Sequence, residues 1–126
     1  MKPLRMVLRA NSLSCLVFGT VFLFGAKSVA LFLGSMPPIV VMGLGLGLVV
    51  NGLHLAAASL RASVRRAEIL YFSAGDFAWA GVTAFLIARG IYMETSHGIA
   101  AAIAVAIAVA VIGVLQLKLL AGQAVA

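Results

Sequence analysis

Four long apolar runs follow one another along this chain and constrain its fold more than any other feature. They cover about residues 6–25, 38–59, 69–91 and 98–120. A helix needs roughly 20 apolar residues to cross the hydrocarbon core of a bilayer, so each run is long enough to span it. With 64% hydrophobic and 10% charged residues, the chain cannot hide this surface as a water-soluble domain. We therefore expect one all-α transmembrane domain over residues 1–126.

The segments between the runs are short. Residues 27–35 are expected to form an apolar connection in the membrane interface, residues 61–68 a charged loop and residues 92–97 a tight polar turn. Pro37-Pro38 stops the first connection and opens the second span, because proline at the first helical position lacks only an N–H that would be unpaired there. Short connections make neighbouring helices antiparallel, so the sequence predicts an up-down four-helix bundle.

The basic residues indicate how the bundle is oriented. With four spans, both termini and the middle loop share one side, and that side holds seven of the nine basic residues, namely Lys2, Arg5, Arg9, Arg61, Arg65, Arg66 and Lys118. Lys27 and Arg89 fall on the other side. Basic residues concentrate on the cytoplasmic side of membrane proteins, so we expect both termini in the cytoplasm and a multi-pass protein of a bacterial inner membrane.

The N-terminus has one alternative interpretation. Lys2, Arg5 and Arg9 precede an apolar stretch, as in a signal peptide. Three further spans follow this stretch, which favours a retained first helix.

Several functional classes are excluded by residue type and spacing. The net charge of +6 has no basic stripe or motif of a nucleic-acid-binding fold around it, so nucleic acid is not an expected partner. A single cysteine, Cys15, excludes an internal disulfide and is expected to be a small buried side chain. His54 and His97 belong at opposite ends of the bundle and cannot ligate one haem iron or zinc ion. No catalytic motif is present, so we expect no enzyme, cofactor or metal.

Each expected span carries small residues at helical spacing. Small residues let membrane helices approach closely, since lipid gives no hydrophobic driving force for their association. The candidate packing residues are Gly19 in the first span, Gly43 and Gly47 of a GxxxG in the second, Ala80 and Ala84 in the third, and Ala104 and Ala108 in the fourth. These faces could pack one bundle internally. Alternatively, one of them, with the fourth helix the best candidate, pairs between protomers or with another membrane protein.

The polar residues inside the spans gather in the cytoplasmic half. At a rise of 1.5 Å per residue, Asp76 and Asn51 lie about 12 Å inside their spans, and the others lie closer to the end. The expected cluster consists of Asp76, Arg9, Asn11, Asn51, His54, Trp79 and Gln116. A charged side chain is costly in a membrane, so Asp76 should face the interior and find partners. The cluster is either a structural clasp that fixes helix register or a proton- or ligand-binding site.

Two motifs carry a resemblance to a known set of proteins. Arg9-Ala10-Asn11-Ser12-Leu13-Ser14 stands in the first span, and Asp76-Phe77-Ala78-Trp79 stands in the third. The chain resembles a loosely defined set of uncharacterised small bacterial four-span membrane proteins with an Asp-x-x-Trp in the third helix. The resemblance implies the four-span plan and no activity.

Two functional hypotheses follow. The first is a non-enzymatic accessory or interaction subunit, as indicated by the small-residue faces and minimal loops. The second is a small oligomeric proton-linked transporter or channel in which Asp76 is the responsive group.

Overall fold

The chain is all-helical in a computed structural model, which describes the backbone of residues 2–125 and the side chains of residues 3–122. The helices are α1 (Lys2–Phe24), α2 (Ala26–Leu33), α3 (Pro38–Leu60), α4 (Arg66–Arg89) and α5 (Ser96–Val125). Four of them, α1, α3, α4 and α5, are long and apolar enough to cross a membrane. The prediction of an all-helical chain with four such helices is confirmed.

One element differs from the expected plan. Within the short connection expected over residues 27–35, the chain forms most of the eight-residue helix α2 (Ala26–Leu33). The segment contains no proline, and its break from α1 lies at Gly25. Gly34 ends it with a φ of 139°, a conformation that residues with a side chain rarely adopt. This connection is thus a short helix bounded by two glycines.

The ends of the long helices follow from local residue types. Pro38 is the first residue of α3, as expected from its missing N–H. Gly90 ends α4 in the left-handed conformation (φ 65°), and the Ile91 N–H donates to the Leu86 carbonyl at 2.9 Å, closing a Schellman-type turn. α4 begins three residues earlier than the expected span, at Arg66, because Arg, Ala and Glu are good helix formers.

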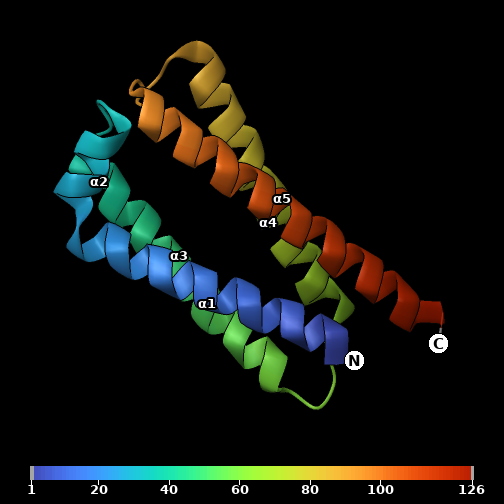
Figure 1. Cartoon of the computed structure of the whole chain (residues 1–126). Helices are drawn as coiled ribbons and strands as arrows, with labels where there is room; N and C mark the ends of the chain where they lie inside the picture. The colour runs from blue at the N-terminus through green and yellow to red at the C-terminus, as the bar shows by residue number, and fades with distance from the viewer. Residues whose placement is uncertain (1, 126) are drawn as a thin grey trace.

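The long helices form two antiparallel pairs, α1 with α3 and α4 with α5 (Figure 1). Glycine makes the first pair close: a Cβ on Gly19 would lie 2.9 Å from the Gly45 carbonyl oxygen, and one on Gly52 would lie 2.9 Å from the Leu16 side chain. In the second pair, Gly113 of α5 faces Phe77 of α4. Each pair is therefore a compact unit with its own internal packing.

The two pairs are joined at both ends of the molecule. Near the chain termini, buried side chains from all four long helices form one apolar cluster, including Leu4, Leu8, Leu55, Phe72 and Leu120. At the opposite end, α2 packs on α3 and α5, and Met36, Val41 and Met93 are buried beside it. Both chain termini lie at the end of the first cluster (Figure 1).

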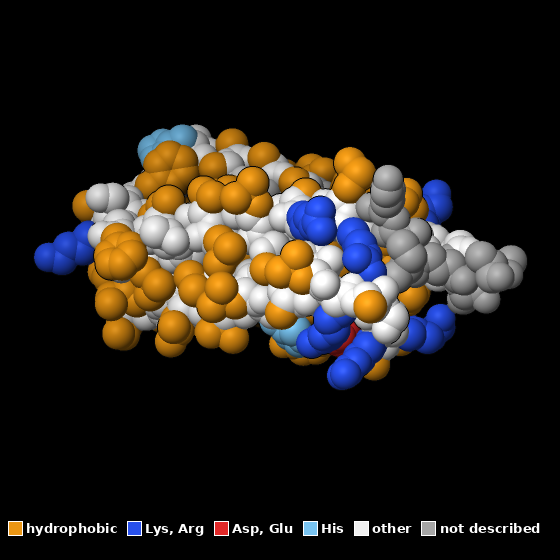
Figure 2. All heavy atoms as spheres, turned by 90° about the horizontal axis from the view of Figure 1, so that it is seen from below, with side chains coloured by type: hydrophobic (Ala, Val, Ile, Leu, Met, Phe, Trp, Pro, Cys, Tyr) orange, Lys and Arg blue, Asp and Glu red, His pale blue; other side chains and the backbone are white. Residues whose placement is uncertain are grey.

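The outer surface is largely hydrocarbon. Large exposed side chains occur on every long helix, among them Phe24, Leu46, Val82 and Ile107. On the face seen in Figure 2, hydrophobic side chains cover the flanks, and most Lys and Arg side chains gather toward one end. This distribution suits a bundle whose flanks face lipid and whose basic end faces water.

Candidate functional site: a cavity between the helix pairs

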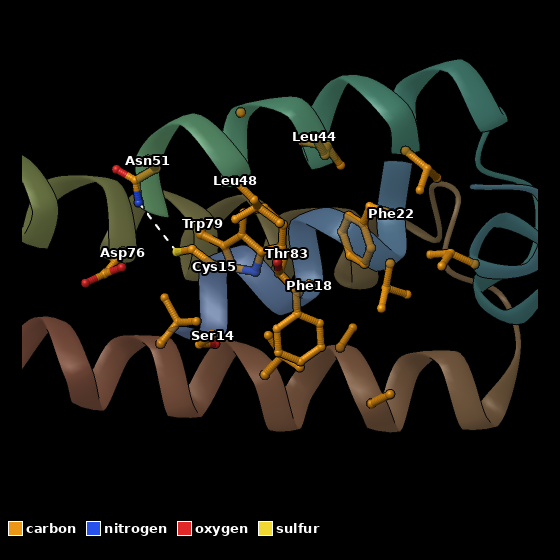
Figure 3. A pocket seen from close by; sticks show the side chains of 18 of the residues that line it. Ser14, Cys15, Phe18, Phe22, Leu44, Leu48, Asn51, Asp76, Trp79 and Thr83 are labelled. Atoms are coloured by element: carbon orange, nitrogen blue, oxygen red, sulfur yellow. Dashed lines mark hydrogen bonds between the residues drawn. The ribbon is translucent and has the colours of Figure 1, made fainter. Parts of the chain in front are cut away.

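A cavity of about 570 Å³ lies between the two helix pairs and is lined by all five helices. Most of its wall is apolar, with aromatic side chains such as Phe18, Phe22 and Phe32. Polar side chains gather at one end, where Asp76 and Asn51 lie in Figure 3, and Phe22 lies toward the other end. Apolar cavities of this size with a few convergent polar groups are typical of small-molecule sites.

Gln116 organises the polar end from the centre of the bundle. Its side chain is fully buried. Its Nε2 donates to Asp76 Oδ2 at 3.1 Å and to Ser73 Oγ at 3.0 Å, and its Oε1 accepts from Asn11 Nδ2 at 2.9 Å. Ser73 Oγ in turn donates to the Gly113 carbonyl at 3.0 Å. The network connects α1, α4 and α5, and so it joins the two helix pairs.

Asp76 takes part in this network through one oxygen. Asn11 Nδ2, at 3.4 Å, and Gln116 Nε2, at 3.1 Å, both donate to Oδ2. Among the described residues no donor contacts Oδ1, and Asp76 belongs to the cavity wall. Neither donor carries a charge, and the cavity lining contains no Lys, Arg or His. The carboxylate therefore has hydrogen-bond partners but no counter-ion in the cavity.

Three further side chains complete the polar end. Asn51 on α3 donates to Cys15 Sγ at 3.6 Å, and Cys15 Sγ lies 3.6 Å from Asn11 Oδ1 (Figure 3). These weak contacts link α3 to the network through a buried thiol. Trp79 lies one helical turn from Asp76 and also lines the cavity. The cavity thus offers a carboxylate, an amide and an indole in one region.

Three of the expected cluster residues meet directly, and two others lie elsewhere. Asn11, Asp76 and Gln116 form the hydrogen-bonded core. Arg9 is exposed and does not belong to the cavity lining. Arg9 therefore lies outside the expected cluster in this structure, because position 9 lies on a different side of α1 from position 11.

His54 forms a separate cluster near the loop between α3 and α4. Its Nε2 lies 2.8 Å from Glu68 Oε2, and Arg61 also bonds Glu68. The imidazole packs edge-on against Phe72, with ring centroids 4.8 Å apart, and lies near Tyr71. His54 therefore also lies outside the cluster around Asp76. Helix α4 begins at Arg66, so Glu68 lies in its first turn, opposite His54. The sequence pattern places Glu68 in a loop and therefore does not predict this contact.

The candidate packing residues divide into two groups. Gly19 is buried against α3, and Ala80 is half-buried. The others are exposed: Gly43, Gly47, Ala84, Ala104 and Ala108. A Cβ on Gly43 or Gly47 would meet nothing within 4 Å, so the close contacts of α3 use Gly45 and Gly52 instead. That the exposed small residues pack against another molecule stays a prediction.

Comparison with known proteins assigns neither a family nor a function to this chain. None of the protein-family models, curated proteins or solved structures compared with this chain gave a match. Within the described residues, no group of three or more His, Cys, Asp or Glu side chains is placed to hold a metal ion. The chemistry that the cavity supplies is hydrogen bonding, one carboxylate and aromatic contact.

Proposed function

We propose that this chain is a non-enzymatic, multi-pass membrane protein that binds a small molecule in the cavity and carries it across the membrane with proton exchange at Asp76. The observation that supports this proposal is the position of Asp76: it belongs to the wall of an apolar cavity, and one carboxylate oxygen has no donor among the described residues. A purely structural clasp would be expected to use both oxygens. A free oxygen in a cavity is available to a ligand or a proton.

The proton linkage follows from charge. An ionised carboxylate inside a membrane is costly unless a proton or a cation neutralises it. Asn11 and Gln116 stabilise the carboxylate by hydrogen bonds but add no positive charge. Binding of a positively charged or proton-donating group at Oδ1 therefore competes with protonation. Such competition is the basis of proton-linked exchange.

The membrane placement is part of the same proposal. We infer an up-down bundle in a bacterial inner membrane with both termini cytoplasmic. The support is the seven-to-two distribution of basic residues along the sequence and the common end of the two termini (Figure 1). The polar end of the cavity then lies nearer the cytoplasm, and α2 covers the outer end.

Labelling with dicyclohexylcarbodiimide tests whether Asp76 exchanges protons. This apolar reagent modifies protonated carboxyl groups that it reaches from the bilayer. In liposomes we expect modification of Asp76, found by mass spectrometry, with a yield that falls as the pH is raised. The Asp76→Asn variant removes the site. Absence of modification at every pH, in protein that remains folded, would show a sealed clasp and end the transport proposal.

A second candidate function is supported by one observation. Gly43 and Gly47 form an exposed small-residue face on α3. Such a face suits a partner helix, as an accessory or interaction subunit requires. Co-purification after gentle solubilisation tests this function. A chain that is monomeric and free of partners under those conditions would contradict it.

A further inference from the structure

The proposed ligand cavity has a charge and a shape that define one chemical class of ligand. Resting on that proposed function, we propose that the cavity binds an amphiphilic monocation, with a small ammonium head at Asp76 and an apolar tail directed toward α2. The inference rests on three features of the wall: its charge, the separation of its polar and apolar parts, and its opening.

The charge of the wall selects a cation. Asp76 is the one ionisable carboxyl group among the lining residues, and no Lys, Arg or His lines the cavity. An anionic ligand would add like charge in a region of low dielectric, which is strongly unfavourable. A neutral ligand would leave the carboxylate without a counter-ion. A single positive charge balances the site, and Trp79 on the same face of α4 can add a cation–π contact.

The separation of polar and apolar groups selects an amphiphile. Asn51 and Asp76 occupy one end of the cavity, and Phe22 lies toward the other end (Figure 3). Asn11 donates to Asp76 at the polar end, and Phe32 of α2 lines the apolar part. Along α1 the distance from position 11 to position 22 is about 16 Å at the helical rise. A small hydrophilic cation would leave this apolar length unfilled. A cation with an alkyl or aryl tail fills both ends.

The opening of the cavity allows such a molecule to enter from the bilayer. Gly43 and Gly47 on α3 and Gly75 on α4 line the cavity and are exposed. A Cβ added at any of these three positions would meet nothing within 4 Å. Helix α3 packs on α1 and helix α4 packs on α5, whereas α3 and α4 make little contact with each other, so we infer that the cavity opens between them. An amphiphile dissolved in lipid can pass through this opening without crossing water.

Binding is tested on the full chain in lipid nanodiscs with the fluorescence of Trp79, the single tryptophan of the protein. Four probes separate the contributions: octyltrimethylammonium, octanol, octyl sulfate and tetramethylammonium. We expect a saturable change of Trp79 emission with octyltrimethylammonium, at an apparent affinity at least about tenfold above those of the other three probes. The Asp76→Asn variant should lose this preference for the cation.

Two glycine variants of α4 test the location of the site. Gly75→Leu fills the opening and should weaken octyltrimethylammonium binding at least about fivefold, because the new side chain occupies space that the ligand needs. Gly81→Leu is the matched control. Gly81 is also exposed, is also free of neighbours within 4 Å, and does not line the cavity. Equal effects of the two substitutions would overturn the assignment of the site.

The outcomes of these binding experiments distinguish a failure of the proposed ligand class from a failure of the proposed function. Octanol or octyl sulfate binding as tightly as the cation overturns the cationic class and leaves a ligand cavity. Tetramethylammonium binding as tightly overturns the role of the tail. No saturable change with any probe overturns both the inference and the proposed function. The comparison of head groups uses wild-type protein, so it decides the class even where Asp76→Asn does not fold.

Discussion

Gln116 on α5 donates a 3.1 Å hydrogen bond to one carboxylate oxygen of Asp76 on α4, and the other oxygen has no donor among the described residues. Replacing Gln116 by an apolar residue would remove three buried hydrogen bonds at once, those with Asn11, Ser73 and Asp76. This residue connects the stability of the bundle to the geometry of the candidate site.

We predict that Gln116→Leu lowers the free energy of unfolding by about 1–3 kcal/mol, because buried partners lose their hydrogen bonds. Thermal unfolding in detergent, followed by circular dichroism, measures the change. Thr20→Val is the control: Thr20 is exposed and bonds only the Leu16 carbonyl of its own helix. A Gln116→Leu protein as stable as wild type would remove the structural role of the network.

Glycines two positions apart on α3 should respond in opposite ways to substitution. Gly45→Ala places a Cβ within 2.9 Å of the Gly19 carbonyl oxygen, so we expect a loss of about 1–3 kcal/mol from overpacking. Gly47→Ala meets no neighbour and should be neutral or stabilising by up to about 1 kcal/mol, because alanine favours the helix. Unfolding of both variants in parallel checks the expectation, and a more harmful Gly47→Ala would point to an interface on the exposed face.

The cluster of His54, Glu68 and Arg61 should contribute little to stability. The side chains of His54 and Arg61 are 39% and 38% exposed, so solvent screens their attraction to Glu68. A double-mutant cycle with His54→Gln and Glu68→Gln is expected to give a coupling energy below about 1 kcal/mol. A coupling several times larger would mean that this cluster is a strong link between α3 and α4 at this end.

The orientation of the chain can be checked with single cysteines placed in a Cys15→Ala background. A membrane-impermeant maleimide should label Glu94→Cys from the outside of intact cells, because the proposed topology puts the loop before α5 at the outer end. It should label Ser63→Cys, in the loop between α3 and α4, only after permeabilisation. Both positions are exposed, so access to water alone decides the result. The reverse pattern would invert the proposed topology.

Exchange of a cation for a proton has a direct readout in proteoliposomes. With a pH-sensitive dye inside, external octyltrimethylammonium should raise the internal pH in the presence of wild-type protein. An internal proton replaces each cation that Asp76 releases inside, and that proton is carried out and displaced by the next external cation. Asp76→Asn should abolish the change, and Gly81→Leu should retain it. Saturable binding without any change of internal pH would retain the ligand class and contradict transport.

The sequence was sufficient for the long helices and for part of the site. Apolar runs and Pro38 placed the four long helices, since these depend on local composition. The meeting of Asn11, Asp76 and Gln116 followed from their common placement in one half of the expected bundle. The sequence did not predict that Arg9 and His54 lie outside the cluster, because their positions depend on how each helix is rotated about its axis. That rotation is set by contacts such as Gly19 with Gly45, which no periodicity in one helix specifies.

The two helix pairs are joined by different kinds of hydrogen bond at the two ends of the cavity. At the polar end, side chains of Asn11, Asp76 and Gln116 join the pairs. At the α2 end, main-chain groups do so: the Glu94 N–H donates to the Leu33 carbonyl at 2.8 Å, and the Ser35 N–H donates to the Tyr92 carbonyl at 2.9 Å. Main-chain bonds survive most changes of side chain. Saturation mutagenesis should therefore find the segment from Leu33 to Ser35 permissive, apart from Gly34, and Asn11 and Gln116 intolerant, so that mutational sensitivity is uneven along the length of one bundle.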